Sequence, residues 1–373
     1  MDKKKIKVTH VTRFAYPHIG GIESVINQIN DSLPNEEFEK EVLCCSNTEK
    51  TSVENGVKYN RARYLFEVFN NTISLSFLWK LSRVNTDILH YHMPFIFAVI
   101  AHFIARPKYK KMYITYHSDL NAYKKVMKYF WWIYKKLYSN ADKIVVLSPN
   151  AIDRDSILAE NKQKITVIPF GINSNISADI EEKHVINGND IKEFARDRKI
   201  LLCIGRFVNL KGFIYAIKAM EHVESAVLLL AGDGELKSYF ETYIKVHHIE
   251  NKVKLIGFVS NDRDKEFLFS NIDILLMTSI KTESFSIVQL EAMKYGKPVI
   301  NTNLGTGVNY VSIDKETGLT VEPENVEQLT NAINELLNND ELRLQYGRNA
   351  RNRMVDRFGI NLIENKYLEL YGE

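Results

Sequence analysis

Two glutamates separated by seven residues stand in the stretch SIKTESFSIVQLEAMKYGKPVINT. Within it, Ser286 and Gln289 have capping-box spacing, which predicts that Ser286 caps a helix and that Gln289 reaches back to it. Glu283 then precedes the helix, and Glu291 lies about 8 Å along its axis from the cap. Free N–H groups at such an N-terminus suit a diphosphate, and the two carboxylates suit ligand hydroxyls. In the alternative interpretation both glutamates are ordinary solvated charges.

Two cations follow another apolar run, in LLCIGRFVNLKGF. Arg206 comes directly after Gly205, and Lys211 precedes Gly212 at the expected start of a helix. An arginine binds phosphate oxygens as a fork and a lysine as a point charge, so the pair suits a diphosphate. The alternative is that both are plain surface charges.

The first half of the chain offers weaker signals. Gly20 and Gly21 follow the run IKVTHV, and their lack of side chains would let backbone amides approach a diphosphate or an acceptor. A tight packing turn is the alternative. Glu23 lies in the first turn of the next expected helix, where it favours the helix dipole. His117 follows YITY and is either a site residue or a satisfied strand-end histidine.

The stretch NAYKKVMKYFWWIYKKLYSNA predicts a helix with one basic face. Its apolar face would hold Val126, Phe130, Ile133 and Leu137, with Met127, Trp131, Tyr134 and Tyr138 beside them. Lys124, Lys125, Lys128, Lys135 and Lys136 would lie opposite, with Trp132 among them. Such a face suits an anionic membrane surface, although a packed helix with a solvated back is the alternative.

Strands must position the residues described above, and short apolar runs mark where these strands are expected. Six in the first half are IKVTHV, EKEVLCC, TDILHYH, KMYITYH, ADKIVVLS and KITVIPFG. Six more are KILLCIG, AVLLLAG, KVKLIGF, IDILLMT, KPVINT and GLTVEP. Because helical spacing separates the runs, they predict two doubly wound α/β domains with parallel sheets, joined by a polar linker within 172–199 that holds at most one helix. Two helical patterns follow, and the first places Leu329, Ile333, Leu336 and Leu337 on one face.

Composition narrows the class of protein. The chain has 373 residues and a net charge of +3. Residues 1–180 hold 25 Lys and Arg against 17 Asp and Glu, and the rest hold 24 against 29. The basic first part favours an anionic partner, and membrane phosphate fits better than nucleic acid, for which no motif is present. We expect no signal peptide and no disulfide among Cys44, Cys45 and Cys203, and hence a cytoplasmic protein. The run PFIFAVIAHFIA is too short to span a bilayer and predicts a buried helix.

Taken together, the motifs resemble retaining glycosyltransferase family 4, also called group 1, of GT-B architecture. The matching elements are GR…KG at 205–212, AGDG at 231–234, GFV at 257–259, the E-x7-E motif, EAMKYGKPVI, TGL and VEP. In the first half P-x-x-GG-x-E, HS at 117–118, VVLSP and IPFGIN also match. The resemblance implies an acceptor-binding Rossmann-like domain at 1–178, a facing nucleotide-sugar domain at 179–355 across a cleft, and a final helix at 356–373 that returns to the first domain.

The resemblance also implies roles. Arg206 and Lys211 would neutralise the departing diphosphate, so that neither a metal nor another cofactor is needed. Glu291 would hold the ribose, and His117 and Glu283 the donor sugar. The other donor-binding positions would be Gly20, Gly21, Gly232, Phe258, Val259, Ser284, Phe285 and Ser286. The chain departs from the family pattern at Phe285-Ser286, where Phe-Gly is frequent, and at LGTGVNYV, which lacks an acid. There Gly305 to Gly307 would offer amides to phosphate, and this variant favours GDP-mannose.

The expected function is retaining transfer of a hexose from a nucleoside-diphosphate sugar to a lipid-linked or membrane-borne saccharide, as in surface polysaccharide or glycolipid synthesis. The enzyme would be cytoplasmic and peripherally bound to the membrane. Three alternatives stay open: a transferase of hexose or N-acetylhexosamine from a UDP-sugar, a nucleotide-sugar epimerase, and a non-catalytic sugar-nucleotide-binding subunit. A dinucleotide dehydrogenase is disfavoured because IGGIES is not G-x-G-x-x-G.

Overall fold

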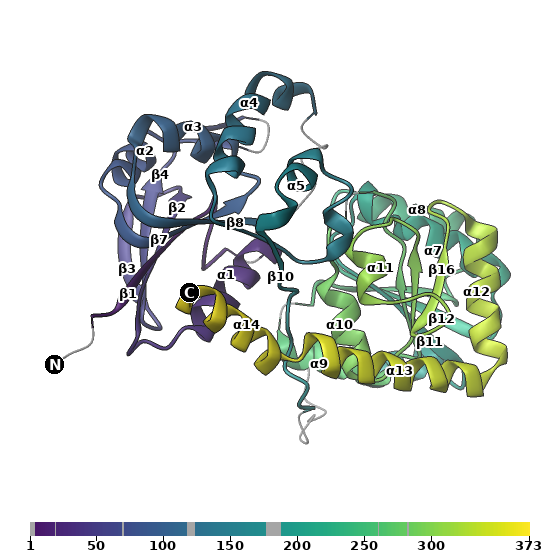
Figure 1. Ribbon diagram of the computed structural model, residues 1–373. Coiled ribbons are helices and arrows are strands. Elements are labelled where there is room, and N and C mark those ends of the chain that lie inside the picture. The colour runs from purple at the N-terminus through teal and green to yellow at the C-terminus, as the bar shows by residue number, and fades with distance from the viewer. Residues whose placement is uncertain are drawn as a thin grey trace. The chain divides into compact units, whose positions relative to one another are not determined.

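The computed structural model describes residues 4–18, 20–68, 71–117, 124–176, 188–259, 261–281 and 283–373, without the side chains of 124–129 and 188–189. The chain forms two compact units. One consists of Met1–Gly171 with Ile360–Glu373, and the other of Ile172–Gly359. Each is an α/β unit built on its own Rossmann-like sheet (Figure 1).

The first unit holds an eight-stranded sheet in the order β10-β9-β8-β7-β1-β2-β4-β3. Neighbouring strands are parallel except β3 and β4, which are antiparallel. The strands are β1 (Ile6–Val11), β2 (Phe38–Ser46), β3 (Lys50–Glu54), β4 (Val57–Arg63), β7 (Asn85–Met93), β8 (Lys108–Tyr116), β9 (Lys143–Val146) and β10 (Ile165–Val167). A separate hairpin consists of β5 (Phe66–Val68) and β6 (Asn71–Ile73).

All six expected strands of this half are present, but β3 to β6 were not predicted. β3 and β4 form a hairpin around Asn55 and Gly56, both of which have positive φ. The strand residues at this sheet edge are largely polar, so they lack the apolar run on which the prediction depended. The all-parallel expectation was therefore wrong at one edge.

The helices of this unit include the predicted buried one, α3, which forms from PFIFAVIAHFIA. The helices are α1 (Gly21–Ser32), α2 (Leu75–Ser82), α3 (Ile96–Ala105), α4 (Lys124–Asn140), α5 (Ser156–Glu160) and α14 (Ile360–Gly372), with 3-10 turns η2 (Pro149–Ala151) and η3 (Lys162–Lys164). The C-terminal α14 is anchored to the sheet, because the hydroxyl of Tyr113 donates to the carbonyl of Leu370 at 3.0 Å. Within the part of the chain that the structure describes, no helix is long and apolar enough to cross a bilayer.

The second unit holds a six-stranded parallel sheet in the order β13-β12-β11-β14-β15-β16. Its strands are β11 (Lys199–Ile204), β12 (Ala226–Ala231), β13 (Val253–Gly257), β14 (Ile274–Met277), β15 (Val299–Thr302) and β16 (Gly318–Val321). The six predicted runs match these strands. Parallel strands are buried on both faces and read as continuous apolar runs, which is why they were easy to find.

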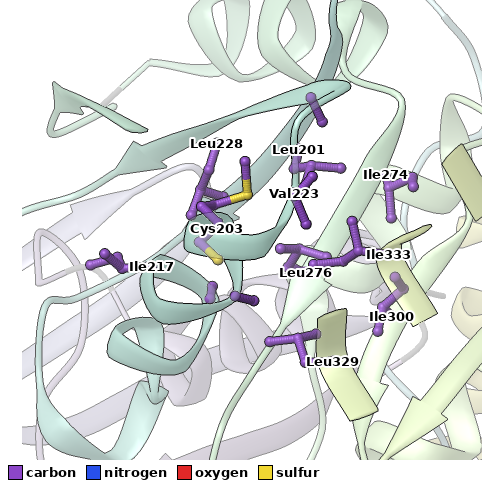
Figure 2. Packing of buried hydrophobic residues seen from close by; sticks show 14 of the residues in the cluster. Leu201, Cys203, Ile217, Val223, Leu228, Ile274, Leu276, Ile300, Leu329 and Ile333 are labelled. Carbon is purple, nitrogen blue, oxygen red and sulfur yellow. The ribbon is translucent and has the colours of Figure 1, made fainter. Parts of the chain in front are cut away.

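The helices of the second unit cover this sheet (Figure 1). They are α6 (Gly188–Ala195), α7 (Phe213–Ala219), α8 (Lys237–Val246), α9 (Asp262–Asn271), α10 (Ile287–Lys294), α11 (Gly307–Val311), α12 (Val326–Asn338) and α13 (Asp340–Phe358), with 3-10 turns η4 (Asn209–Lys211) and η5 (Met220–His222). Figure 2 shows Leu329 and Ile333 of α12 within the core that includes Leu201 and Leu276 of the sheet. The first of the two predicted helical patterns of the tail is divided into α12 and α13, because the side chain of Asn339 accepts from Leu342 N at 3.0 Å and starts α13.

Candidate active site

The carboxyl ends of β11, β12 and β13 meet at one edge of the second sheet. Gly205 N donates to Ala231 O at 2.9 Å, and Gly232 N donates to Gly257 O at 2.7 Å. Gly232 has φ +151°, and a Cβ there would lie 1.9 Å from the Gly205 carbonyl oxygen. Only glycine fits this close approach, which brings the residues after each strand together.

Lys211 and Glu283 form an ion pair at this edge. Lys211 Nζ lies 2.6 Å from Glu283 Oε2, and both side chains are about a quarter exposed. Thr278 fixes the loop after β11 to the end of β14, because its hydroxyl donates to Lys211 O at 3.0 Å. Ser279 supports the carboxylate, since its hydroxyl donates to Glu283 Oε2 at 3.3 Å. The structure thus joins two predicted site residues that the sequence analysis had not paired with each other.

Arg206 is exposed after β11. Among the residues that the structure describes, none forms an ion pair with it. Its guanidinium can therefore bind an incoming phosphate without breaking an existing salt bridge. Lys211, by contrast, would have to break or share its ion pair with Glu283 when it binds a phosphate.

The capping-box prediction for α10 was wrong, although Ser286 is the N-cap residue. The Ser286 side chain makes no cap hydrogen bond and instead contacts Met277 Sδ at 3.6 Å. Gln289 is fully buried, and its amide donates to Val308 O at 3.1 Å and accepts from Asn301 at 3.2 Å. Gln289 is therefore used by buried polar groups of α11 and β15 and not by the start of α10.

Glu291 lies on α10, one turn beyond its start. Its carboxylate is 3.8 Å from Lys265 Nζ of α9. Burial raises the pKa of Glu291, and the Lys265 cation opposes that shift. A half-buried carboxylate with one distant cation keeps hydrogen-bonding capacity for ligand hydroxyls.

Three residues predicted to contact the donor differ in the exposure of their side chains. The Phe258 side chain, directly after β13, is 72% exposed, whereas Val259 and Phe285 are buried. The Phe285 ring packs against Phe358 with centroids 6.1 Å apart. Phe258 can therefore offer a ring face to a ligand, and the other two can offer only backbone groups.

The amides of the loop at 304–307 are mostly engaged. Gly305 N donates to Asn309 Oδ1 at 2.8 Å, and Gly307 N donates to Ser284 O at 3.0 Å. The expectation that this glycine-rich loop offers its amides to phosphate was therefore wrong for both glycines. Asn309 Oδ1 also accepts from Leu304 N at 2.9 Å, so the protein itself satisfies these amides.

His117 lies at the carboxyl end of β8 in the first unit, where its N–H donates to Met93 O at 3.0 Å. Its ring is buried, and His117 Nε2 lies 3.0 Å from His92 Nδ1. Burial lowers the pKa of His117 to about 3. The sequence analysis missed its partner His92, although TDILHYH carries histidines two residues apart, a spacing that places both on one face of a strand.

Gly20 and Gly21 begin α1 in the same unit. Gly20 is the N-cap, and a Cβ there would lie 2.4 Å from Glu23 Oε2, whereas one on Gly21 would meet nothing within 4 Å. Glu23 Oε1 also lies 3.2 Å from His18 Nδ1. Glu23 therefore has two structural neighbours, and Gly21 has no packing reason to be glycine.

Helix α4 is described in part. The side chains of Lys124, Lys125 and Lys128 lie outside the described residues. Trp132 is 66% exposed, while Tyr134, Leu137 and Tyr138 are buried. Lys135 Nζ lies 2.5 Å from Glu160, and Lys136 Nζ lies 5.7 Å from the Phe103 ring centroid. Two of the five lysines thus have partners within the protein.

Two Rossmann-like units, with cations and carboxylates at the carboxyl edge of the second sheet, define the GT-B class of glycosyltransferases. The sucrose-phosphate synthase of Thermosynechococcus elongatus has this fold, with a TM-score of 0.80, 20% identity, and 99% of this chain and 98% of that chain covered. Anabaena HepE in complex with UDP-glucose superimposes with a TM-score of 0.77 at 16% identity, covering 99% and 100%. At these identities the likeness shows the fold alone.

Sequence comparisons define the family. The family described as "Glycosyl transferases group 1" matches residues 188–353, and "Glycosyltransferase Family 4" matches residues 19–175. The O-antigen chain mannosyltransferase C of Escherichia coli is 30% identical over 379 residues, which cover 98% of each chain. The D-rhamnosyltransferase WbpZ of Pseudomonas aeruginosa is 26% identical over 342 residues, covering 90% of this chain and 87% of the relative. The chain belongs to glycosyltransferase family 4, group 1, and is a glycosyltransferase.

Proposed function

We propose that this glycosyltransferase moves a hexose, with retention, from a nucleoside-diphosphate sugar to a hydroxyl of a lipid-linked or membrane-borne saccharide. The favoured donor is GDP-mannose. The carrying observation is the Lys211–Glu283 pair beside the exposed Arg206. The mannosyltransferase and rhamnosyltransferase relatives support a sugar of this kind and an acceptor in surface polysaccharide synthesis.

In this proposal the second unit binds the donor. Arg206 and Lys211 bind the diphosphate and neutralise the charge that develops on it, which is where electrostatic stabilisation lowers a barrier most. These cations take the part that a metal ion has in other transferases, so we expect activity without added metal. Glu291 accepts from the ribose hydroxyls, and the Phe258 ring offers a face to the base.

In the same proposal the first unit supplies His117 and binds the acceptor. Glu283, released from Lys211, accepts from hydroxyls of the donor sugar, and His117 lies beside its reacting carbon. The acceptor oxygen forms a bond to that carbon as the bond to the diphosphate breaks, on the same face. The acceptor proton passes to the departing diphosphate oxygen, so the atoms balance without a protein nucleophile.

Donor screening tests the proposal. A ligand present at 100 times its dissociation constant stabilises a protein by about 2.7 kcal/mol, which a thermal-shift assay detects. We expect GDP-mannose and GDP to stabilise the protein and UDP-sugars to have little effect. Stabilisation by UDP-sugars alone would favour the UDP-dependent alternative, and conversion of the donor to an isomer without acceptor would favour an epimerase.

A further inference from the structure

Four histidines share one face of the first sheet. His10 on β1 is paired in register with His90 on β7, and His92 on β7 is paired with Thr115 on β8. Because side chains two residues apart on a strand face the same way, His90, His92 and the residues opposite them gather on that face. His10, His90, His92 and His117 are all buried, with 0%, 0%, 1% and 7% exposed.

Three of these rings form a continuous chain. His10 Nδ1 lies 3.0 Å from His92 Nε2, and His92 Nδ1 lies 3.0 Å from His117 Nε2. His90 stands beside the chain with both nitrogens used, one by Thr115 Oγ1 at 2.7 Å and the other by the Tyr371 hydroxyl. At the inner end of this chain of rings, His10 Nε2 is buried and has no hydrogen-bond partner among the residues that the structure describes.

The three linked histidine rings are uncharged at neutral pH. Burial lowers the pKa of His10 and of His117 to about 3, and it lowers the pKa of His92 well below its usual value. Each neutral ring has one N–H and one lone pair, so every link needs a donor on one side and an acceptor on the other. The three tautomers are therefore coupled, and fixing one fixes the others.

Only two arrangements satisfy both links. In the first, His10 Nδ1 donates to His92, His92 Nδ1 donates to His117 Nε2, and His117 carries its hydrogen on Nδ1. In the second, all three hydrogens sit on Nε2, which leaves a buried His10 N–H without an acceptor. The first arrangement leaves the same nitrogen as a lone pair without a donor. Either kind of unpaired buried group costs about 1–3 kcal/mol, so the charges around His10 decide between the two arrangements.

Lys40 favours the first arrangement. Lys40 lies on β2, on the other side of β1 from β7, and its Nζ donates to Asn30 O and Leu33 O, both at 2.8 Å. Its cation contributes to lowering the pKa of His10. A positive charge on the β2 side of His10 favours a lone pair, rather than an N–H, on Nε2, the ring nitrogen that does not face His92.

We propose that His10 and His92 are positioning residues that set the tautomer of His117, so that His117 Nδ1 carries the hydrogen and donates it to the sugar of the donor. The last step rests on the proposed function, which places His117 at that sugar. His92 then acts through His117 and touches no substrate, and His10 acts through His92.

A metal site is the competing use of these residues. The ligand atoms of His10, His90 and His92 lie within 4.8 Å of one another. A divalent cation takes one nitrogen from each ring, so it would have to displace one hydrogen bond of His90, to Thr115 or Tyr371, and one of His92, to His10 or His117. The hydrogen-bonded chain accounts for five of the six ring nitrogens of these three residues without a metal.

The tautomers can be read directly by long-range 1H–15N correlation spectra of protein labelled with 15N-histidine. We expect His10, His92 and His117 each to carry hydrogen on Nδ1 at pH 7. Hydrogen on Nε2 of His117, an imidazolium, or loss of these signals on adding equimolar Zn²⁺ would overturn the proposal. Because this measurement needs no substrate, it decides the tautomers whether or not the proposed transfer is found.

Kinetics then test the consequence, using release of GDP from GDP-mannose with polyprenyl-diphosphate-linked saccharides. His92→Asn keeps an amide N–H near the former Nδ1, whereas His92→Leu removes the link. We expect His92→Leu to lower kcat at least about tenfold with little change in the KM of the donor, because orienting an essential histidine acts on kcat. His92→Asn should restore most of the loss.

His102→Leu, which removes a buried histidine bonded to Tyr91 at 2.9 Å, is the control. Equal kcat in His92→Leu and His102→Leu would contradict the positioning role.

Discussion

Lys211 Nζ and Glu283 Oε2 lie 2.6 Å apart, although the two residues are 72 positions apart in the sequence. The contact joins the loop after β11 to the segment before α10. Each group holds the other in place at the carboxyl edge of the sheet, where parallel α/β sheets bind their ligands. A diphosphate that takes Lys211 frees Glu283 for a hydroxyl, so the pair couples donor binding to the positioning of the sugar.

Replacing Lys211 by alanine should lower kcat/KM for sugar transfer by about 100-fold or more, because the leaving diphosphate loses a stabilising cation. Steady-state release of the nucleoside diphosphate measures the effect. The matched control is Lys252→Ala, since Lys252 forms a 2.6 Å pair with Glu224 just before β13, at the other edge of the sheet. Equal losses in both variants would show that Lys211 matters only as a structural ion pair.

Gly20 and Gly21 should respond differently to alanine. A Cβ on Gly21 meets nothing, and alanine is the better helix former, so Gly21→Ala should raise the free energy of unfolding by about 0.4–1 kcal/mol. If the backbone there approaches a ligand, the same change should lower transfer. Gly20→Ala only has to displace the end of the Glu23 side chain, but it replaces the N-cap glycine by a poorer capping residue, so it should lower the free energy of unfolding. Full activity of Gly21→Ala would show that no ligand needs the close approach of the Gly21 backbone.

The second unit could be predicted almost entirely because its strands are buried on both faces. The places of the E-x7-E and GR…KG residues on these elements were also predicted, since Arg206 and Lys211 follow β11, Glu283 precedes α10 and Glu291 lies within it. The Ser286 and Gln289 interaction was mispredicted, because the buried neighbours Val308 and Asn301 compete for Gln289, and only tertiary structure shows that competition.

The buried histidines should make stability depend on pH. The folded pKa values of His10 and His117 are about 3, and an unfolded histidine titrates near 6.5. Unfolding therefore takes up protons between these values, so the free energy of unfolding falls as the pH is lowered through that window. Each proton contributes about 1.4 kcal/mol per pH unit.

Urea unfolding at pH 7, 6 and 5 measures this slope. The three tryptophans, at positions 79, 131 and 132, all belong to the first unit, so their fluorescence reports on the unit that holds the histidines. His10→Phe should reduce the slope by about one proton below pH 6. An unchanged slope would show that His10 is not buried in its neutral form.

Trp132 should mediate membrane contact if α4 lies on a lipid surface. We expect Trp132→Ala to reduce co-sedimentation with phosphatidylglycerol vesicles, because it removes an exposed indole beside basic residues. Trp79→Ala is the control, since Trp79 is also exposed, at 52%, but is covered by the Arg83 guanidinium at 3.8 Å from its ring. If the wild type and both variants sediment equally with the vesicles, α4 is not the membrane-binding element.

The first unit was harder to predict than the second. The β3–β4 hairpin lies at a polar sheet edge, and only its Asn55-Gly56 turn signals it in the sequence. The histidine chain could not be predicted because His10, His92 and His117 come from three strands whose register the sequence does not show. His117 was singled out by its place after a strand, and its partners required the assembled sheet.

The anomeric configuration of the product tests the central proposal most directly. GDP-mannose labelled with 13C at C1 would be incubated with polyprenyl-diphosphate-linked saccharides, and the coupling of C1 to its hydrogen would be read from the NMR spectrum of the product. We predict a new glycosidic bond with the α configuration of the donor. A β-linked product, or an isomerised nucleotide sugar formed without any acceptor, would contradict retaining transfer.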